Sequence, residues 1–357
     1  MKAKSIASLR GIASNLPGKR KELFDRIYGV SETDGRMAVP GSMQPWVKKR
    51  FGSVKAVEQQ KIIRVDNWVT GESALFNALR SLRPKQGAPV KSGLPTGKCL
   101  FCSPGKNTPE DVFGRIRGRH CITASNVAKY DKWHGLVIFN EHNPFRFNDT
   151  KISDYLNTSM KWFGTVMEHD AKARHPFFMW NCLWRAGASI IHGHAQVTVS
   201  EKPYARFTRL ASAAKRYNKK HKSGYFDDVF LSHKAVGLGM KNRGARVMAY
   251  MTPVKDNEIV MISDDLGRDF AKLLDRIMRA FFGKSDRGFN LSIIPFPLYG
   301  DGNTRGEWEG LPYITRLVER GLLEERNSDI GSMELHATTV ISTDPFKTIR
   351  MVKSALS

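Results

Sequence analysis

The sequence is poor in cysteine and in long apolar runs. Its four cysteines among 357 residues are too few for a disulfide framework. The longest apolar run spans only residues 177–184, far short of the roughly 20 residues that cross a bilayer as a helix. We therefore expect no membrane span. With 41% hydrophobic residues, a chain of this length can bury a sizeable core.

Acidic residues are also scarce. The 57 Lys and Arg residues outnumber 34 Asp and Glu and give a formal net charge of +23. The excess is concentrated in residues 1–98 and 201–246. It indicates a polyanionic partner such as nucleic acid, or anionic substrates; a generally basic proteome is the alternative. No secretory signal is recognisable, so we expect a cytoplasmic protein, although the basic N-terminus would also suit a mitochondrial presequence.

Two segments have the apolar spacing of amphipathic helices, residues 152–170 and 266–282. Strand-like segments flank each of them: residues 134–139, 177–184 and 188–200 in the first case, and 246–254, 258–263, 288–296 and 333–343 in the second. The sequence therefore predicts an α+β fold, an antiparallel sheet with packed helices.

The two sets of elements follow a similar order, which suggests an internal duplication. The stretch from His194 and the stretch from His336 share His, Ala, Ser and Pro over ten positions. We expect a basic N-terminal region at 1–98, a first unit at 99–200, a basic helical linker at 201–245 and a second, degenerate unit at 246–357. The Gly-rich residues 299–310 are interpreted as a surface loop or lid.

The segment from residue 188 to 200 carries the main candidate site. Ile190, Ile191, Val197 and Val199 favour a strand. On a strand, His192, His194 and Gln196 would project from one face at a spacing of about 7 Å. Because the flanking positions are apolar, this polar face is better explained as a site than as a solvated surface.

A second candidate is the CxxC formed by Cys99 and Cys102. In a reducing compartment this spacing indicates a metal or redox site, and a metal site needs two further ligands. Cys121 and Cys182 are expected to be small core residues.

Taken together, the HxHxQ stretch, the CxxC, the histidine in "NEHNP" and the repeated unit resemble the galactose-1-phosphate uridylyltransferases, the transferase branch of the histidine-triad superfamily. The resemblance implies duplicated histidine-triad-like units and a structural zinc held by Cys99, Cys102, His142 and His192. It also implies that His194 is the nucleophile and that Gln196 holds the phosphate. It further implies nucleotide or phosphate contacts by Asn126, Asn181 and Ser189.

The resemblance implies an enzyme that transfers a nucleotidyl group between a nucleotide sugar and a sugar phosphate through a covalent nucleotidyl-histidine. A homodimer is the oligomeric state that we consider for this protein. The family's sugar-binding segment has no clear match in residues 330–335, which argues against galactose 1-phosphate as acceptor. Two alternatives stay open. One is a phosphorylase or hydrolase of dinucleoside polyphosphates or nucleotide sugars, and the other is a zinc-stabilised nucleic-acid-binding protein.

Overall fold

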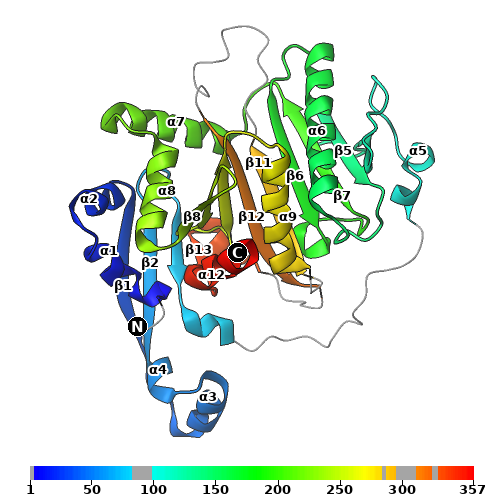
Figure 1. Ribbon diagram of the computed structural model, residues 1–357. Coiled ribbons are helices and arrows are strands. Elements are labelled where there is room, and N and C mark those ends of the chain that lie inside the picture. Colours follow the sequence, from blue (N-terminus) through cyan, green and yellow to red (C-terminus); the bar gives the residue numbers. More distant parts are fainter. Residues whose placement is uncertain (1–3, 83–98, 284–286, 295–310, 324–328) are drawn as a thin grey trace.

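A computed structural model describes residues 4–82, 99–283, 287–294, 311–323 and 329–357. Within these ranges, nine strands form one antiparallel sheet in the order β4-β5-β7-β6-β11-β12-β10-β9-β8 (Figure 1). The predicted α+β class, an antiparallel sheet with packed helices, is confirmed. The strands are β4 Cys121–Ser125, β5 Trp133–Phe139, β6 His175–Cys182, β7 His194–Ser200, β8 Gly239–Asn242, β9 Ala245–Ala249, β10 Ile259–Ser263, β11 Arg287–Ile294 and β12 Tyr313–Leu322.

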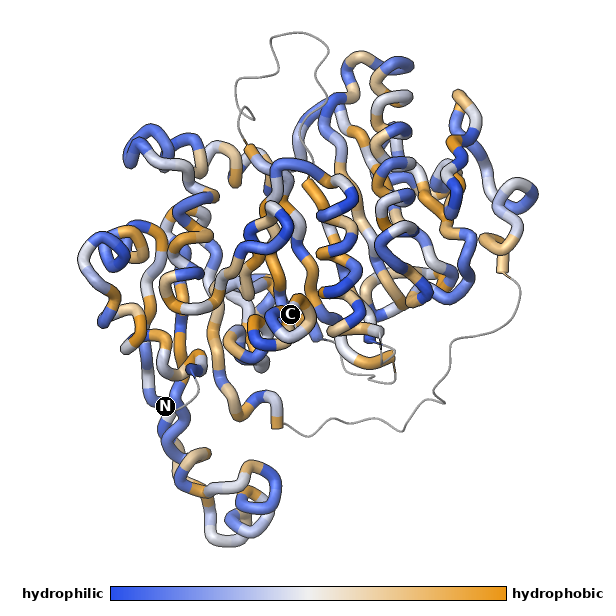
Figure 2. The backbone as a smooth tube through the Cα atoms, viewed as in Figure 1, coloured by the Kyte–Doolittle hydropathy of each residue, from blue (hydrophilic) through white to orange (hydrophobic). Residues whose placement is uncertain are grey.

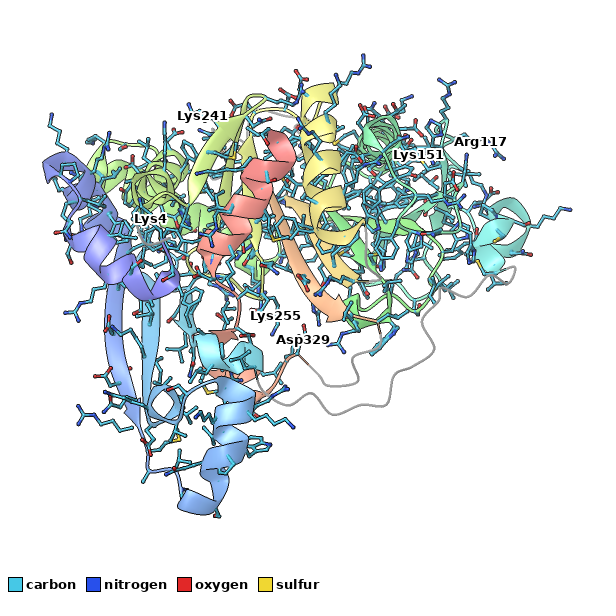
Figure 3. All side chains as sticks on the ribbon, turned by 60° about the horizontal axis from the view of Figure 1, so that its bottom comes forward. Lys4, Arg117, Lys151, Lys241, Lys255 and Asp329 are labelled. Atoms are coloured by element: carbon cyan, nitrogen blue, oxygen red, sulfur yellow. The ribbon has the colours of Figure 1, made fainter. Side chains whose placement is uncertain are left out.

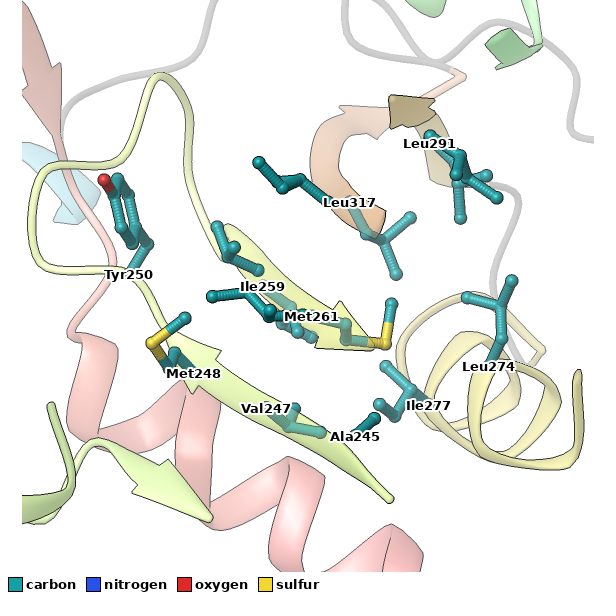
Figure 4. Packing of buried hydrophobic residues seen from close by; sticks show 14 of the residues in the cluster. Ala245, Val247, Met248, Tyr250, Ile259, Met261, Leu274, Ile277, Leu291 and Leu317 are labelled. Atoms are coloured by element: carbon teal, nitrogen blue, oxygen red, sulfur yellow. The ribbon is translucent and has the colours of Figure 1, made fainter. Parts of the chain in front are cut away.

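One face of this sheet is covered by α6 (Asp149–His169) and α9 (Arg268–Phe282), which run side by side (Figure 1). Both helices were predicted from their apolar spacing. The Asn148 side chain caps α6 by accepting the Lys151 N–H. The apolar side of α9 buries Leu274 and Ile277 against the strands (Figure 4). The hydropathy colouring shows that the strands beneath both helices are largely hydrophobic (Figure 2).

The two halves of the sheet have corresponding topologies. β4, β5, α6, β6 and β7 give the spatial order β4-β5-β7-β6, and β9, β10, α9, β11 and β12 give β9-β10-β12-β11. β6 and β11 join the halves, with Asn181 opposite Asn290. This correspondence fits the expected duplication, which stays a prediction.

The predicted closing strand at 333–343 is wrong. Those residues form α11 (Ser332–His336) and the short β13 (Thr339–Ile341). β13 pairs in parallel with β3 (Ser73–Phe76) in a second sheet, of order β1-β2-β3-β13. The last strand of the second half is β12, so the comparison of the His194 and His336 stretches aligned unrelated elements. β-branched residues favoured a strand there but could not specify which sheet it joins.

The N-terminal region supplies most of the second sheet. The hairpin of β1 (Tyr28–Arg36) and β2 (Gln59–Asn67) extends from the body and has α3 (Gln44–Phe51) and α4 (Val54–Glu58) at its far end (Figure 1). The exposed Lys48 and Lys49 on α3 contribute to the basic charge. The remaining helices are α1 Leu9–Ser14, α2 Gly18–Ile27, α5 Pro104–Asn107, α7 Ala205–His221, α8 Tyr225–Val236 and α12 Pro345–Leu356.

Two further expectations concern segments outside the sheet. The basic helix expected between the units is α7, and its buried residues include Ala214 and Tyr217. The Gly-rich segment 299–310 lies outside the described residues. None of the helices in the described part of the chain has the length and hydropathy of a membrane span.

Candidate active site and metal site

Four side chains meet at one end of the first half of the sheet. Cys99 precedes a single 3-10 turn and Cys102 ends it, His142 follows β5, and His192 precedes β7. Their ligand atoms all lie within 4.8 Å of one another. The structure thus brings together the four predicted metal ligands from segments up to 93 residues apart.

The spacing of these atoms fits a tetrahedral zinc. Bond lengths of about 2.3 Å to sulfur and 2.0–2.1 Å to nitrogen imply ligand separations of about 3.8 Å between the sulfurs and about 3.5 Å between sulfur and nitrogen. The two Sγ atoms are 3.7 Å apart. The four separations between a sulfur and a histidine Nδ1 range from 3.3 to 3.7 Å. A Cys2His2 set of this geometry could bind one metal ion.

His192 is oriented by a second contact. Its Nε2 lies 2.8 Å from the Phe139 carbonyl oxygen, which can only accept. Nε2 therefore carries the proton, and the Nδ1 lone pair faces the two thiols. A backbone carbonyl that fixes the ring through its other nitrogen is the usual support of a metal-ligating histidine.

We expected His192, His194 and Gln196 to project from one face of a strand. In the structure, β7 begins only at His194. That prediction is wrong for His192, which lies in the preceding bend. Gly193 marks the departure, because its backbone pairs with Phe139 and His142. A Cβ at position 193 would lie 2.7 Å from the Phe139 ring and 3.2 Å from the Glu141 carbonyl oxygen. The chain passes too close to β5 here for any residue but glycine.

His194 and Gln196 do share a face, opposite the face that packs on α6. His194 is 7% exposed, and its Nδ1 lies 2.8 Å from the His192 carbonyl oxygen. The carbonyl can only accept, so the proton is on Nδ1 and the lone pair is on Nε2. Burial lowers the pKa of His194, which keeps the ring neutral near pH 7. The Phe101 ring packs edge-on against it, with centroids 5.2 Å apart.

Gln196 is anchored by His134, a residue that the sequence reasoning missed. The Gln196 Oε1 lies 2.9 Å from the His134 Nε2. His134 is fully buried on β5, and burial lowers the pKa of its ring. The available signal was a histidine in an otherwise apolar strand, which we interpreted only as part of that strand.

Asn181, near the end of β6, is held in a similar way from the second half of the molecule. Its Oδ1 accepts a hydrogen bond of 2.7 Å from Asn290, whose own Oδ1 accepts one of 2.7 Å from Arg320. Arg320 pairs with Asp329, whose carbonyl oxygen accepts from Lys255 (Figure 3). The Asn181 oxygen is thereby occupied, and its amide N–H2 is the group left to donate.

Asn126 and Ser189 are the two remaining residues that we expect to contact a ligand. Asn126 follows β4 directly, and its backbone N–H donates to the His134 carbonyl oxygen. Ser189 is exposed in the bend before the histidine doublet. Their contacts with a ligand stay predictions.

No protein-family model matches the chain, and no curated protein matches its sequence. Solved structures do match. An ADP-glucose phosphorylase from Arabidopsis thaliana, solved with bound ADP-glucose, gives a TM-score of 0.62 at 15% identity over 80% of this chain and 96% of that one. A GalT-like protein from the same plant gives 0.61 at 15% identity, covering 81% and 97%. A uridylyltransferase gives 0.56 at 14% identity, covering 82% and 97%.

The chain has the fold of the GalT-like uridylyltransferases and of ADP-glucose phosphorylase. This confirms, for the fold, the resemblance that was inferred from the HxHxQ, CxxC and His142 residues. At identities of 14–15%, the likeness establishes architecture, whereas activity has to be inferred from the site.

Proposed function

We propose that this protein is a nucleotidylyltransferase that acts on a nucleoside diphosphate sugar and a sugar 1-phosphate through a covalent nucleotidyl-His194. The observation that supports it most directly is the tautomer of His194. The hydrogen bond from its Nδ1 to the His192 carbonyl oxygen leaves a lone pair on Nε2. A neutral imidazole held this way is a nucleophile that needs no general base.

The reaction balances without a net proton transfer. The Nε2 lone pair attacks the α-phosphorus, and the bond from that phosphorus to the bridging oxygen breaks. Sugar 1-phosphate leaves with the electron pair. The positive charge on the ring is stabilised by the Nδ1–H bond to His192. An oxygen of a second sugar 1-phosphate then attacks the same phosphorus, and the bond to Nε2 breaks and restores neutral His194.

Gln196 favours transfer over hydrolysis. Its amide donates to a non-bridging phosphate oxygen but cannot act as an acid. Phosphate leaving groups need little protonation, so an amide is sufficient. Asn181 and Ser189 would add phosphate contacts, and Asn126 a nucleotide contact.

The four ligands Cys99, Cys102, His142 and His192 would hold a zinc ion whose chemistry is structural. A Cys2His2 set fills the tetrahedron, so no position is left for substrate. In the protein, these four side chains tie the turn that carries Phe101 to the segment just before His194. The metal site would therefore set the position of the nucleophile.

The second half contributes no equivalent nucleophile in this proposal and is the degenerate copy. On the corresponding face, Arg316 pairs with Glu258 and Glu72. The cavity beside them measures only about 50 Å³, and Tyr225 and Phe226 of α8 are among the residues that line it. That space does not accommodate a nucleotide.

The transferase is uridylyltransferase-like in mechanism, with hexose 1-phosphates as the acceptor class. A phosphorylase of nucleotide sugars is the second candidate, because the ADP-glucose phosphorylase shares the fold. Both would use His194, and they differ in whether sugar 1-phosphate or inorganic phosphate accepts the nucleotidyl group.

An acceptor competition separates these activities. The protein is incubated with UDP-glucose, ADP-glucose or GDP-glucose labelled in the α-phosphate, together with equal concentrations of glucose 1-phosphate labelled in the sugar and inorganic phosphate. Label exchange into the nucleotide sugar supports the transferase. Accumulation of a nucleoside diphosphate instead supports the phosphorylase. Absence of both products with all three donors would contradict the proposed function.

A further inference from the structure

We propose that His134 is a positioning residue that fixes which end of the Gln196 amide faces the substrate phosphate. The proposal rests on the function proposed above and extends it to a residue outside the HxHxQ stretch. His134 and Gln196 lie diagonally across neighbouring strands, since His134 pairs with Thr198 and Leu136 pairs with Gln196.

The backbone determines the tautomer of His134. The Tyr130 N–H points at the Nδ1 of His134 over 3.0 Å. A backbone N–H can only donate, so Nδ1 has to be the acceptor. A neutral imidazole with an accepting Nδ1 carries its proton on Nε2. Nε2 is therefore a donor, and its direction does not depend on any side-chain rotation.

The donor on His134 determines the orientation of Gln196. The His134 Nε2 lies 2.9 Å from the Gln196 Oε1. If the amide were turned over, an N–H2 group would face an N–H donor, and the buried contact would be lost. The orientation with Oε1 on His134 leaves both amide protons of Gln196 for an anion. The Asn126 Nδ2 lies 3.1 Å from the same His134 nitrogen, but that nitrogen is already protonated and cannot accept from it.

The surroundings of His134 hold the ring rigidly. The Tyr130 ring stacks on it, with centroids 4.4 Å apart and an angle of 25° between the planes. Lys129 donates from Nζ to both the Ser125 hydroxyl and the His134 carbonyl oxygen. The segment between β4 and β5 thus restricts the movement of the His134 ring.

This orientation matters because the two ends of an amide have opposite effects on a phosphate. The N–H2 end donates to a non-bridging oxygen, whereas the carbonyl end would repel it. Loss of one preorganised donor to a developing anion costs about 10²-fold or more in kcat in enzymes where it has been measured. Without His134, Gln196 could adopt both orientations, and two equally populated orientations would lower the rate about 2-fold, which is less than the loss for removing the amide.

A double-mutant cycle tests this coupling in the full-length protein. The variants are His134→Phe, Gln196→Met and the double change, and the readout is the rate of protein nucleotidylation by the best nucleotide sugar. We expect Gln196→Met to lower the maximal rate of nucleotidylation about 10²-fold and His134→Phe to lower it at least about 2-fold, with the double change no slower than Gln196→Met. A double mutant slower by the product of the two effects would overturn the proposal.

His233 provides a matched control. It is also fully buried and held by backbone on both ring nitrogens, by the Met251 N–H and the Val229 carbonyl oxygen. His233→Phe should lower stability and leave kcat unchanged. If His134→Phe resembles His233→Phe, His134 has a structural role only. If the parent protein is not nucleotidylated at all, the proposed function fails rather than this inference.

A second measurement does not depend on the variants folding. In protein labelled with ¹⁵N-histidine, the ring nitrogen shifts of His134 report its tautomer. We expect the proton on Nε2 at pH 7. A proton on Nδ1 would overturn the proposal directly, because His134 could then not donate to Gln196.

Discussion

Loss of the metal should destabilise the whole first half of the sheet, and Cys102→Ser is the substitution that tests it. Cys102 is exposed, so replacing its sulfur by oxygen disturbs little packing and acts mainly on metal binding. We expect the parent protein to bind one zinc per chain and the variant to lose it, because thiolates supply half of the ligand set.

The size of the effect follows from the loops that the metal closes. Cys102 and His142 are 40 residues apart. A cross-link over such an interval is worth about 4 kcal/mol in the chain-entropy estimate. With an unfolding entropy of about 2.1 cal/mol/K per residue, the loss corresponds to a fall in Tm of about 5 °C for this chain. Loss of the metal also opens the loop between His142 and His192, which would lower the Tm further.

Metal analysis and thermal unfolding, with and without a strong chelator, measure this prediction. The chelator should lower the Tm of the parent by a similar amount and leave that of Cys102→Ser unchanged. Cys182→Ala is the control, because Cys182 is a buried cysteine outside the cluster. It should lose stability and keep both its metal and its response to chelator. A Cys102→Ser protein that retains one zinc, or a parent whose Tm ignores the chelator, would refute the metal-site prediction.

Three further predictions follow from the site and the core. Galactose 1-phosphate should be a poor acceptor, with kcat/KM below about 10⁴ M⁻¹s⁻¹ in steady-state kinetics, because residues 330–335 do not match the family's sugar-binding segment. Gln196→His should still form the nucleotidyl adduct but release it mainly to water, since an acid now adjoins the phosphate; unchanged partition between hydrolysis and transfer would contradict this. Burial lowers the pKa of His233 to about 4, while the unfolded chain binds that proton near pH 6.5. The unfolded state therefore binds more protons between these values, and stability should fall by about 3 kcal/mol as the pH drops through this range. Denaturant unfolding of the parent and of His233→Phe should show that the variant lacks this contribution.

The elements that the sequence predicted well are those with a strong local pattern. α6 and α9 show apolar residues at helical spacing over several turns, and β5, β6 and β7 are apolar strands. The metal cluster was predicted because family resemblance linked residues 93 positions apart, which no local signal does. β4 and β12 were missed; β4 is only five residues long, and the arginine and glutamate residues of β12 obscure the alternation.

The remaining features depend on contacts between strands that are distant in sequence. His134 on β5 contacts Gln196 on β7, and Asn290 on β11 donates to Asn181 on β6. β13 joins a sheet whose other strands lie near the N-terminus. His192 was misplaced on β7 because Gly193 allows the chain to leave the strand where it approaches β5, and that approach is a tertiary contact.

The most direct test of the proposed mechanism is to locate a nucleotidyl group on the protein. The parent, His194→Ala and His169→Ala, a control at an exposed histidine at the end of α6, are each incubated with α-labelled UDP-, ADP- and GDP-sugars and denatured. The parent and His169→Ala should retain acid-labile, base-stable label with one nucleotide, on the peptide that contains residue 194. His194→Ala should retain none while keeping its metal and its fold. Equal labelling of His194→Ala would contradict the assignment of the nucleophile, and with it the proposed transferase.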